Sequence, residues 1–262
     1  MSNVAFANVS VKFGTVEVAS GITFDVQDGE WVSVVGPNGA GKTTLLQTLV
    51  GAVAPDGGSV TIDGQTVLAM HERNRARAVA YVPQRPVFPA GMAVFDYVLL
   101  GRTPHMGTLA SESADDVALV WDALSALHLG SFAGRNLSTL SGGEVQRVAL
   151  ARVVAQQAPV LVLDEATASL DLAAQHEVLE MIDGLRSSRR MTVVSAIHDL
   201  TAAAQFSDKV ALLAEGELCG FGTPSDVLTE RILQEVLESE VRVLDVDGNP
   251  VIVSLRSKES AE

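Results

Sequence analysis

The sequence predicts an α/β fold with a mainly parallel sheet, an N-terminal antiparallel β-layer and an inserted helical subdomain. Short apolar runs at Trp31–Val35, Val160–Leu163 and Thr192–Ile197 have the length and composition of buried strands. A helix-like segment, Ala173–Leu185, separates the last two runs. Strands that alternate with helices in this way indicate a parallel sheet. From about residue 89 the apolar residues instead recur at helical spacing.

The composition fits one folded chain without a membrane-spanning part. A length of 262 residues suits one large α/β domain, and 47% of the residues are hydrophobic and 19% charged. The longest apolar runs, such as Pro159–Leu163, are far shorter than the roughly 20 residues that cross a bilayer. Residues 1–8 lack the basic and apolar regions of a secretory signal, so we expect a cytoplasmic protein.

The charge of the chain limits its partners. A formal net charge of −14 argues against broad adsorption to DNA or anionic lipid, so we expect no nucleic-acid partner. A nucleotide polyanion needs only a local positive site. The single cysteine, Cys219, cannot form an internal disulfide, and we expect it to be a small buried hydrophobic residue.

The N-terminal segment alternates apolar and polar residues. It predicts antiparallel strands at Val4–Val11 and Ile22–Val26, with turn residues at Gly14 and Gly21. A second hairpin is predicted around Asp63-Gly64, because this pair is a strong signal for a two-residue turn. The strands of that hairpin are Ser59–Ile62 and Gln65–Val67.

The stretch from about Pro89 to Leu140 is predicted to be helical. Apolar residues at helical spacing form one helix face, namely Val117, Val120, Trp121, Leu124 and Leu127. Ser113 precedes this helix and Asp116 follows three residues later, which resembles a capping box. We therefore expect a helical subdomain inserted at about residues 89–155. The tail from Ser257 is polar and is expected to fray.

A phosphate-binding loop follows the first predicted core strand. Gly36-Pro-Asn-Gly-Ala-Gly-Lys-Thr43 matches G-x-x-x-x-G-K-[ST], and a helix is predicted at Thr44–Val50. The match predicts a P-loop NTPase core. Its glycines let successive N–H groups curl around the β-phosphate, while Lys42 can reach the β- and γ-phosphates and Thr43 can ligate Mg²⁺. The predicted ATP-binding residues of the loop are Gly36, Pro37, Asn38, Gly39, Ala40, Gly41, Lys42, Thr43 and Thr44.

Two carboxylates end the predicted strand that begins at Val160. Asp164, at the strand end, can hold the Mg²⁺ shell, and Glu165 can face an attacking water. In a site for phosphoryl transfer, Asp164 would therefore bind the metal and Glu165 would act as the base.

The most discriminating segment is Leu140-Ser-Gly-Gly-Glu144. A serine and two glycines at the start of a helix form a second anion-binding site, and one chain cannot easily use both sites at once. The segment resembles the signature sequence of ABC ATPases and lies between the phosphate loop and the acidic strand, as in that family. The resemblance covers almost the whole chain. In this family the signature contacts ATP on the opposite subunit, and its residues here are Ser141, Gly142, Gly143 and Glu144.

Three further positions match the family order and take their roles from the resemblance. Gln84, in Tyr81-Val-Pro-Gln84, resembles the glutamine that touches Mg²⁺ and the attacking water. Asp171, in Ser169-Leu-Asp171, resembles the D-loop residue at the dimer interface. His198 resembles the switch histidine that contacts the γ-phosphate. The implied catalytic residues are Glu165, His198, Gln84 and Lys42, and the implied Mg²⁺ residues are Thr43, Gln84 and Asp164.

Three positions depart from the common family pattern, and one of them, Ala166 in place of the usual proline after the acids, puts nothing catalytic in doubt. The other two concern implied site residues. Phe13 lies where a tyrosine often stacks on adenine, and packing within the β-layer is the alternative for its ring. Glu144 stands where glutamine is common. Neither change removes the implied role.

The resemblance implies an ATPase that forms a head-to-tail homodimer around two ATP molecules. Separate transmembrane permease subunits and, through them, a substrate-binding protein would be its partners, at the cytoplasmic face of the membrane. Val98–Gly107 and a predicted hairpin at Val241–Leu255, around Asp247-Gly248-Asn249, look like the ATPases of iron-siderophore, haem and cobalamin importers. Generic packing is the alternative for both segments. We expect an ABC ATPase domain at residues 1–240, then a hairpin and polar tail at 241–262.

Other functions remain open on the sequence. An importer ATPase for another substrate, such as metal ions, has the same motifs. A soluble ABC ATPase for iron–sulfur assembly would copurify with soluble partners, and a repair ATPase would contain a long coiled-coil insertion, which this sequence lacks. A scaffold that binds ATP without hydrolysis would be expected to lack the base, yet Glu165 and His198 are both present.

Overall fold

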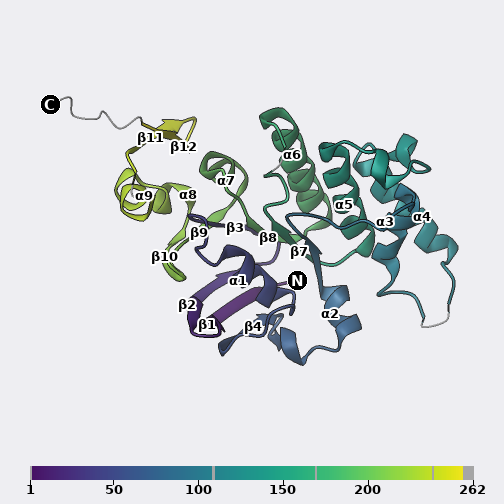
Figure 1. The fold of residues 1–262 in the computed structure, drawn as a ribbon, viewed down its shortest axis with the longest axis horizontal. Coiled ribbons are helices and arrows are strands. Elements are labelled where there is room, and N and C mark those ends of the chain that lie inside the picture. The colour runs from purple at the N-terminus through teal and green to yellow at the C-terminus, as the bar shows by residue number, and fades with distance from the viewer. Residues whose placement is uncertain (1, 108–109, 169, 238, 256–262) are drawn as a thin grey trace.

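Two sheets and the helices around them form the framework of the molecule (Figure 1). The computed structural model describes residues 2–107, 110–168, 170–237 and 239–255. Within these residues the larger sheet has six strands. In sheet order they are β10 (Glu217–Gly222), β9 (Lys209–Ala214), β3 (Trp31–Val35), β8 (Thr192–Ala196), β7 (Val160–Asp164) and β6 (Val79–Val82).

The larger sheet is parallel except at one edge. β3 pairs in parallel with β8 and β9, and β7 pairs in parallel with β8 and β6. Only β10, at the edge, runs antiparallel to its neighbour β9. Every residue of β3, β7 and β8 is buried, as expected for parallel strands that are covered on both faces. The prediction of a mainly parallel sheet is confirmed.

The N-terminal strands form the second, antiparallel sheet, as predicted. Its strands are β2 (Val16–Val26), β1 (Val4–Phe13), β4 (Gly57–Ile62) and β5 (Gln65–Thr66). The Asp63-Gly64 turn is confirmed, because both residues have the positive φ of a type I′ turn, 51° and 74°. The predicted turn at Gly21 is wrong. Gly21 lies inside β2 next to a register shift, so it belongs to a β-bulge of a continuous strand.

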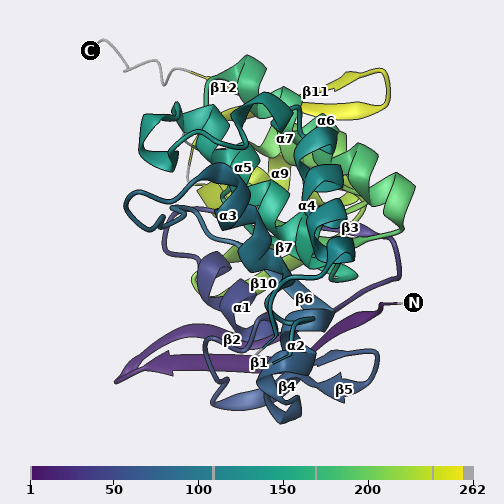
Figure 2. The same ribbon diagram turned by 90° about the vertical axis from the view of Figure 1, so that its right-hand side faces the viewer.

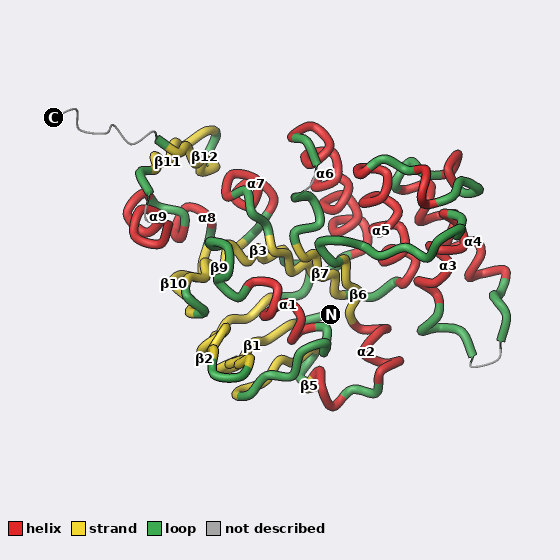
Figure 3. The backbone as a smooth tube through the Cα atoms, viewed as in Figure 1, coloured by secondary structure: helices red, strands yellow, loops and turns green. Residues whose placement is uncertain are grey.

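The helices cover both faces of the larger sheet (Figure 3). They are α1 (Lys42–Leu49), α2 (Glu72–Ala78), α3 (Val94–Leu99), α4 (Ala114–Ala126), α5 (Gly142–Gln156), α6 (Leu172–Arg189), α7 (Leu200–Phe206), α8 (Pro224–Val227) and α9 (Glu230–Leu237). Short 3₁₀ turns lie at Val67–Ala69, Leu100–Arg102, Gly130–Phe132 and Leu137–Thr139. Of the described helices, none is both long and apolar enough to cross a bilayer.

Helix α1 lies between the two sheets. Its Leu45, Leu46 and Leu49 are fully buried in one apolar core with residues of β1, β2, β3 and β7. A second core, on the opposite face of the larger sheet, contains residues of α3 to α7. Figure 2 shows the antiparallel sheet at one end of the molecule and the helices α3 to α6 towards the other. The phosphate loop therefore enters a helix whose position is fixed by packing from two sides.

Helix α4 confirms the predicted capping box. The Ser113 hydroxyl accepts a hydrogen bond from the Asp116 backbone N–H, and the Asp116 carboxylate accepts one from the Ser113 N–H. Leu124 is buried on the predicted apolar face, but Trp121 is 46% exposed. Its ring lies beside that of Phe95, with the ring centres 5.4 Å apart, at the margin of the core. Trp121 therefore lies at the exposed edge of the predicted helix face.

The prediction that Cys219 is buried is also wrong. Cys219 is exposed on β10, the edge strand of its sheet, where it lines a cavity of about 910 Å³ together with Arg231 and Val236 of α9. An edge strand exposes alternate side chains that an inner strand would bury.

A buried ion pair fastens the segment before α4. Arg102 donates a hydrogen bond from Nε to Asp116 Oδ1 at 2.8 Å, and a second from Nη1 to the carbonyl oxygen of Ala155 at 2.8 Å. Both charged side chains are buried. Hydrogen bonds from the Ser113 hydroxyl and from Arg102 lower the pKa of Asp116 to about 2. The pair thus joins the turn at residues 100–102 to α4 and to the end of α5.

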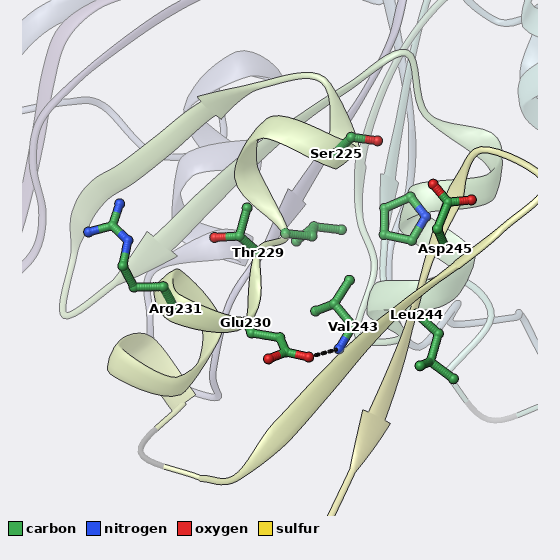
Figure 4. Close-up of a pocket in the computed structure, with 9 residues that line it drawn as sticks. Ser225, Thr229, Glu230, Arg231, Val243, Leu244 and Asp245 are labelled. Carbon is green, nitrogen blue, oxygen red and sulfur yellow. Dashed lines mark hydrogen bonds between the residues drawn. The ribbon is translucent and has the colours of Figure 1, made fainter.

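The predicted C-terminal hairpin is confirmed as β11 (Val241–Val246) paired with β12 (Asn249–Ser254). It packs on two helices. The Ile252 N–H donates to Thr201 Oγ1 of α7 at 3.0 Å, and the Val243 N–H donates to Glu230 Oε1 of α9 at 3.1 Å (Figure 4). A cavity of about 480 Å³ lies between the hairpin and the α8–α9 segment. The predicted polar tail from Ser257 lies outside the described residues.

We predict that Asp116→Asn lowers the free energy of unfolding at pH 7 by about 3 kcal/mol, because Arg102 would be left as a buried charge without its counter-ion. Asp115→Asn, at an exposed position in the same turn, should leave stability unchanged. Because the pKa of Asp116 is lowered from 3.8, its contribution is complete above about pH 4 and is lost as the pH falls towards 2. Urea unfolding at pH 7 and between pH 4 and 3 measures both effects. A difference between wild type and Asp116→Asn that did not narrow in acid would contradict the assignment.

Candidate active site

The predicted site residues lie where parallel strands end at one edge of the larger sheet. β3 leads into the loop at residues 36–43, β7 ends at Asp164, and His198 follows the end of β8. Asp164 pairs with Ala196, the last residue of β8, so the two strands end at the same level. In-register parallel pairing therefore brings together residues that are far apart in the sequence.

The loop requires glycine at its two ends. Gly36 has a φ of 143° and Gly41 a φ of 93°, which residues with a side chain rarely adopt. A Cβ on Gly36 would lie 2.0 Å from the carbonyl oxygen of Leu213, and one on Gly41 would lie 2.3 Å from that of Val18. The loop borders a cavity of about 170 Å³, lined by Val18, Asn38, Gly39, Ala40, Gly41, Lys42, Thr43, Thr44 and Glu165.

Lys42 places a positive charge at this cavity. Its ammonium group donates to the carbonyl oxygens of Gly36 at 2.9 Å and Pro37 at 3.0 Å, and Nζ lies 3.7 Å from Glu165 Oε1. The side chain is only 5% exposed. The loop thus holds its cation by backbone carbonyls, next to the N-terminus of α1.

Asp164 connects α1 to two neighbouring strands. The Thr43 hydroxyl donates to Asp164 Oδ1 at 2.8 Å, and the Tyr81 hydroxyl donates to Oδ2 at 2.9 Å. Burial, reinforced by the adjacent carboxylate, raises the pKa of Tyr81, so its hydroxyl keeps its proton at neutral pH. Sequence reasoning found Thr43 and Asp164 but missed Tyr81, which it treated only as the start of the segment leading to Gln84.

Glu165 lies between two cavities. Its Oε2 accepts a hydrogen bond from Gln84 Nε2 at 2.7 Å, and its backbone N–H donates to Ala196 at 3.0 Å. Besides the cavity of the phosphate loop, Glu165 borders a second cavity of about 310 Å³. His198 is exposed and lines this second cavity. The structure therefore brings Lys42, Gln84 and Glu165 together. His198 lies at the second cavity, which Glu165 also borders.

The segment at residues 141–144 lies apart from both cavities. Of the described residues that line them, none belongs to this segment. Ser141 is the N-cap of α5. Its backbone N–H donates a hydrogen bond to Glu144 Oε2 at 2.6 Å. That hydrogen bond lowers the pKa of Glu144. Glu144 is therefore a helix-capping carboxylate, and Gly142 is exposed at the start of the helix.

The remaining predicted residues are accessible at element ends. Phe13, the last residue of β1, is 55% exposed, which does not support the alternative that its ring packs within the β-layer. Asp171 caps α6 by accepting a hydrogen bond from the Ala174 N–H at 2.9 Å, and Leu172 beside it is also exposed. Ser169, the first residue of the predicted D-loop motif, lies outside the described residues.

Known proteins resemble this chain over most of its length. The sequence profile described as ABC transporter matches residues 19–168. The hemin import ATP-binding protein HmuV of Gloeobacter violaceus is 39% identical over 260 residues, which is 96% of this chain and 94% of the relative. The cobalamin import ATP-binding protein BtuD of Halobacterium salinarum is 38% identical over 235 residues, which is 90% of this chain but only 58% of that longer protein.

A solved structure resembles the chain over nearly its whole length. This structure, an inward-facing conformation from a transporter assigned to the metal-chelate type of ABC transporter, has a TM-score of 0.85 and 28% identity. The match covers 98% of this chain and 99% of that one. Because the profile matches more than half of the chain and the relatives match most of it, the chain belongs to the ABC transporter family, as one of its ATPase cassettes.

Proposed function

We propose that this chain hydrolyses Mg-ATP at a site shared by two copies of itself and thereby energises import through separate membrane subunits. The observation that supports this most directly is the cavity of about 170 Å³ at the phosphate loop, which Lys42, Thr43 and Glu165 all line. A cation, a hydroxyl and a carboxylate at one cavity are the groups that phosphoryl transfer to water requires.

The positions of the residues support the proposed catalytic roles. Glu165 polarises the attacking water, because its carboxylate borders the cavity and is oriented by the hydrogen bond from Gln84. Lys42 and the N–H groups at the start of α1 stabilise charge on the transferred phosphoryl group. His198, at the neighbouring cavity, contributes a further hydrogen bond to the γ-phosphate.

The residues present fit a magnesium ion that arrives with ATP. Thr43, Asp164 and Gln84 offer oxygen atoms, the donor type that Mg²⁺ prefers. Because the Thr43 hydroxyl gives its hydrogen to Asp164, the lone pairs of its oxygen remain available to a cation. When bound, the ion neutralises phosphate charge, and Thr43, Asp164 and Gln84 are the residues that would hold it.

Two copies complete the site. The N-terminus of α5 presents Ser141, Gly142 and Gly143 away from the cavities of its own chain, so it is available to ATP on a second copy. Asp171 and Leu172, exposed at the start of α6, lie at the interface of that dimer. A head-to-tail arrangement of two copies then places each signature segment against the phosphate loop of the other.

The transported substrate class is inferred from the relatives. Their names refer to hemin and cobalamin import, and the similar structure to a metal-chelate type transporter. We therefore assign the chain to the uptake of an iron-siderophore, haem or cobalamin-type chelate, as a peripheral subunit at the cytoplasmic face of the membrane. Permease subunits and a substrate-binding protein are its partners. Residues 1–240 form the ATPase domain, with a helical subdomain at about 89–155, and 241–262 form the C-terminal hairpin and tail.

We predict that Glu165→Gln lowers the rate of phosphate release by roughly 100-fold or more, the usual contribution of a general base. The variant should still bind Mg-ATP and elute as a dimer in size-exclusion chromatography with Mg-ATP. Glu180→Gln, at an exposed position on α6, is the matched control and should behave as wild type. Unchanged phosphate release would remove Glu165 from its role, and a variant that stayed monomeric with ATP would contradict closure of the site by two copies alone.

Phe13→Ala should weaken ATP binding by about 1–2 kcal/mol, because an exposed ring that stacks on a base contributes roughly that amount. Phe13→Tyr should bind like wild type. Val16→Ala, at the exposed strand partner of Phe13, controls for effects on the hairpin. Calorimetric titration with ATP measures the three variants, and equal affinity of Phe13→Ala and wild type would show that adenine does not stack there.

A further inference from the structure

Tyr81, the first residue of the segment that leads to Gln84, touches the candidate site from β6. It lies on β6 opposite Val162 of β7, in a parallel pair. Alternate residues of a strand project from one face, so Tyr81, Val162 and Asp164 share a face of the sheet. Asp164 lies about 6–7 Å further along β7 than Val162. The length of the tyrosine side chain spans this offset, and its hydroxyl meets Asp164 Oδ2 at 2.9 Å.

The other oxygen of Asp164 meets α1. Thr43, in the first turn of that helix, donates to Asp164 Oδ1 at 2.8 Å. Tyr81 and Thr43 therefore each hold one oxygen of the same carboxylate, the first from β6 and the second from α1.

The segment that begins with Tyr81 serves both acids at the end of β7. Tyr81 donates to Asp164, and three residues later Gln84 donates to Glu165 at 2.7 Å. The two hydrogen bonds fix neighbouring carboxylates from one short stretch of chain. Of these two donors, only Gln84 has a role in the mechanism proposed above.

We propose that Tyr81 is a positioning residue, which fixes the orientation of the Asp164 carboxylate and thereby sets the affinity of the site for the divalent cation that accompanies ATP. The inference rests on the proposed role of Asp164 in holding that cation.

The burial of Asp164 makes the Tyr81 hydroxyl difficult to replace. Asp164 is 2% exposed, so bulk water cannot readily supply a substitute donor to Oδ2. A buried acceptor that loses its donor keeps the cost of its desolvation. With Oδ2 free, the carboxylate would rotate about its Cβ–Cγ bond and Oδ1 would lose its fixed direction towards Thr43. Groups that orient a metal-binding side chain commonly change metal affinity by about 10- to 100-fold when removed.

Tyr81→Phe tests the proposal, because it removes the hydroxyl and keeps the ring. Mn²⁺ is titrated into the full chain with a non-hydrolysable ATP analogue, and electron paramagnetic resonance reports free Mn²⁺. We expect the affinity for Mn²⁺ to fall roughly 10-fold. Binding of the analogue in EDTA should stay within about twofold of wild type, because the phosphate loop is untouched. The Mg²⁺ concentration for half-maximal phosphate release should rise in parallel with the loss of Mn²⁺ affinity.

Tyr97→Phe is the matched control. The chain has two tyrosines, and Tyr97 is a buried residue of α3 beside Phe88, away from Asp164. Tyr97→Phe should bind Mn²⁺ like wild type. Melting temperatures without nucleotide show that the variants keep their fold.

Asp164→Asn, measured in the same titration, tests the proposed cation site separately from the proposed role of Tyr81. If Asp164→Asn bound Mn²⁺ as tightly as wild type, the proposed cation site would be wrong, and the role of Tyr81 with it. If Asp164→Asn weakened binding while Tyr81→Phe bound Mn²⁺ as well as or better than wild type, the proposed function would stand and the role of Tyr81 would be overturned.

Discussion

The candidate site depends on the two hydrogen bonds that the Asp164 carboxylate accepts. Its backbone belongs to β7, and its two oxygens accept hydrogen bonds from α1 and β6, so three elements meet at one buried residue. The pairing of Asp164 with Ala196 also aligns the end of β8, after which His198 follows. The phosphate loop, Glu165 and His198 are thus placed relative to one carboxylate.

Contiguous motifs explain how much could be predicted from the sequence. The phosphate loop, the Asp164-Glu165 pair and the Asp63-Gly64 turn each depend on neighbouring residues, and all three lie where the sequence predicted them. The apolar runs of the central strands were equally clear, because strands buried on both faces contain few polar residues. By contrast, β6 spans only Val79–Val82 before a proline, and its short pattern gave no strand signal.

Contacts across the sheet could not be predicted in this way. The hydrogen bond between Tyr81 and Asp164 joins residues 83 positions apart, and it depends on the register between β6 and β7. The errors have the same origin. Cys219 is exposed because β10 is an edge strand, and Gly21 lies in a bulge because of the pairing of β1 with β2. Sheet order and register are properties of the folded chain that local patterns do not contain.

The backbone of Glu165 has a consequence for the balance between stability and turnover. Glu165 adopts a left-handed conformation with a φ of 47°, which costs a residue with a side chain about 1–2 kcal/mol. Glycine would relieve this strain, but it would remove the carboxylate that faces the cavity. Selection for thermal stability alone would therefore favour glycine at this position and the loss of the carboxylate from the candidate site.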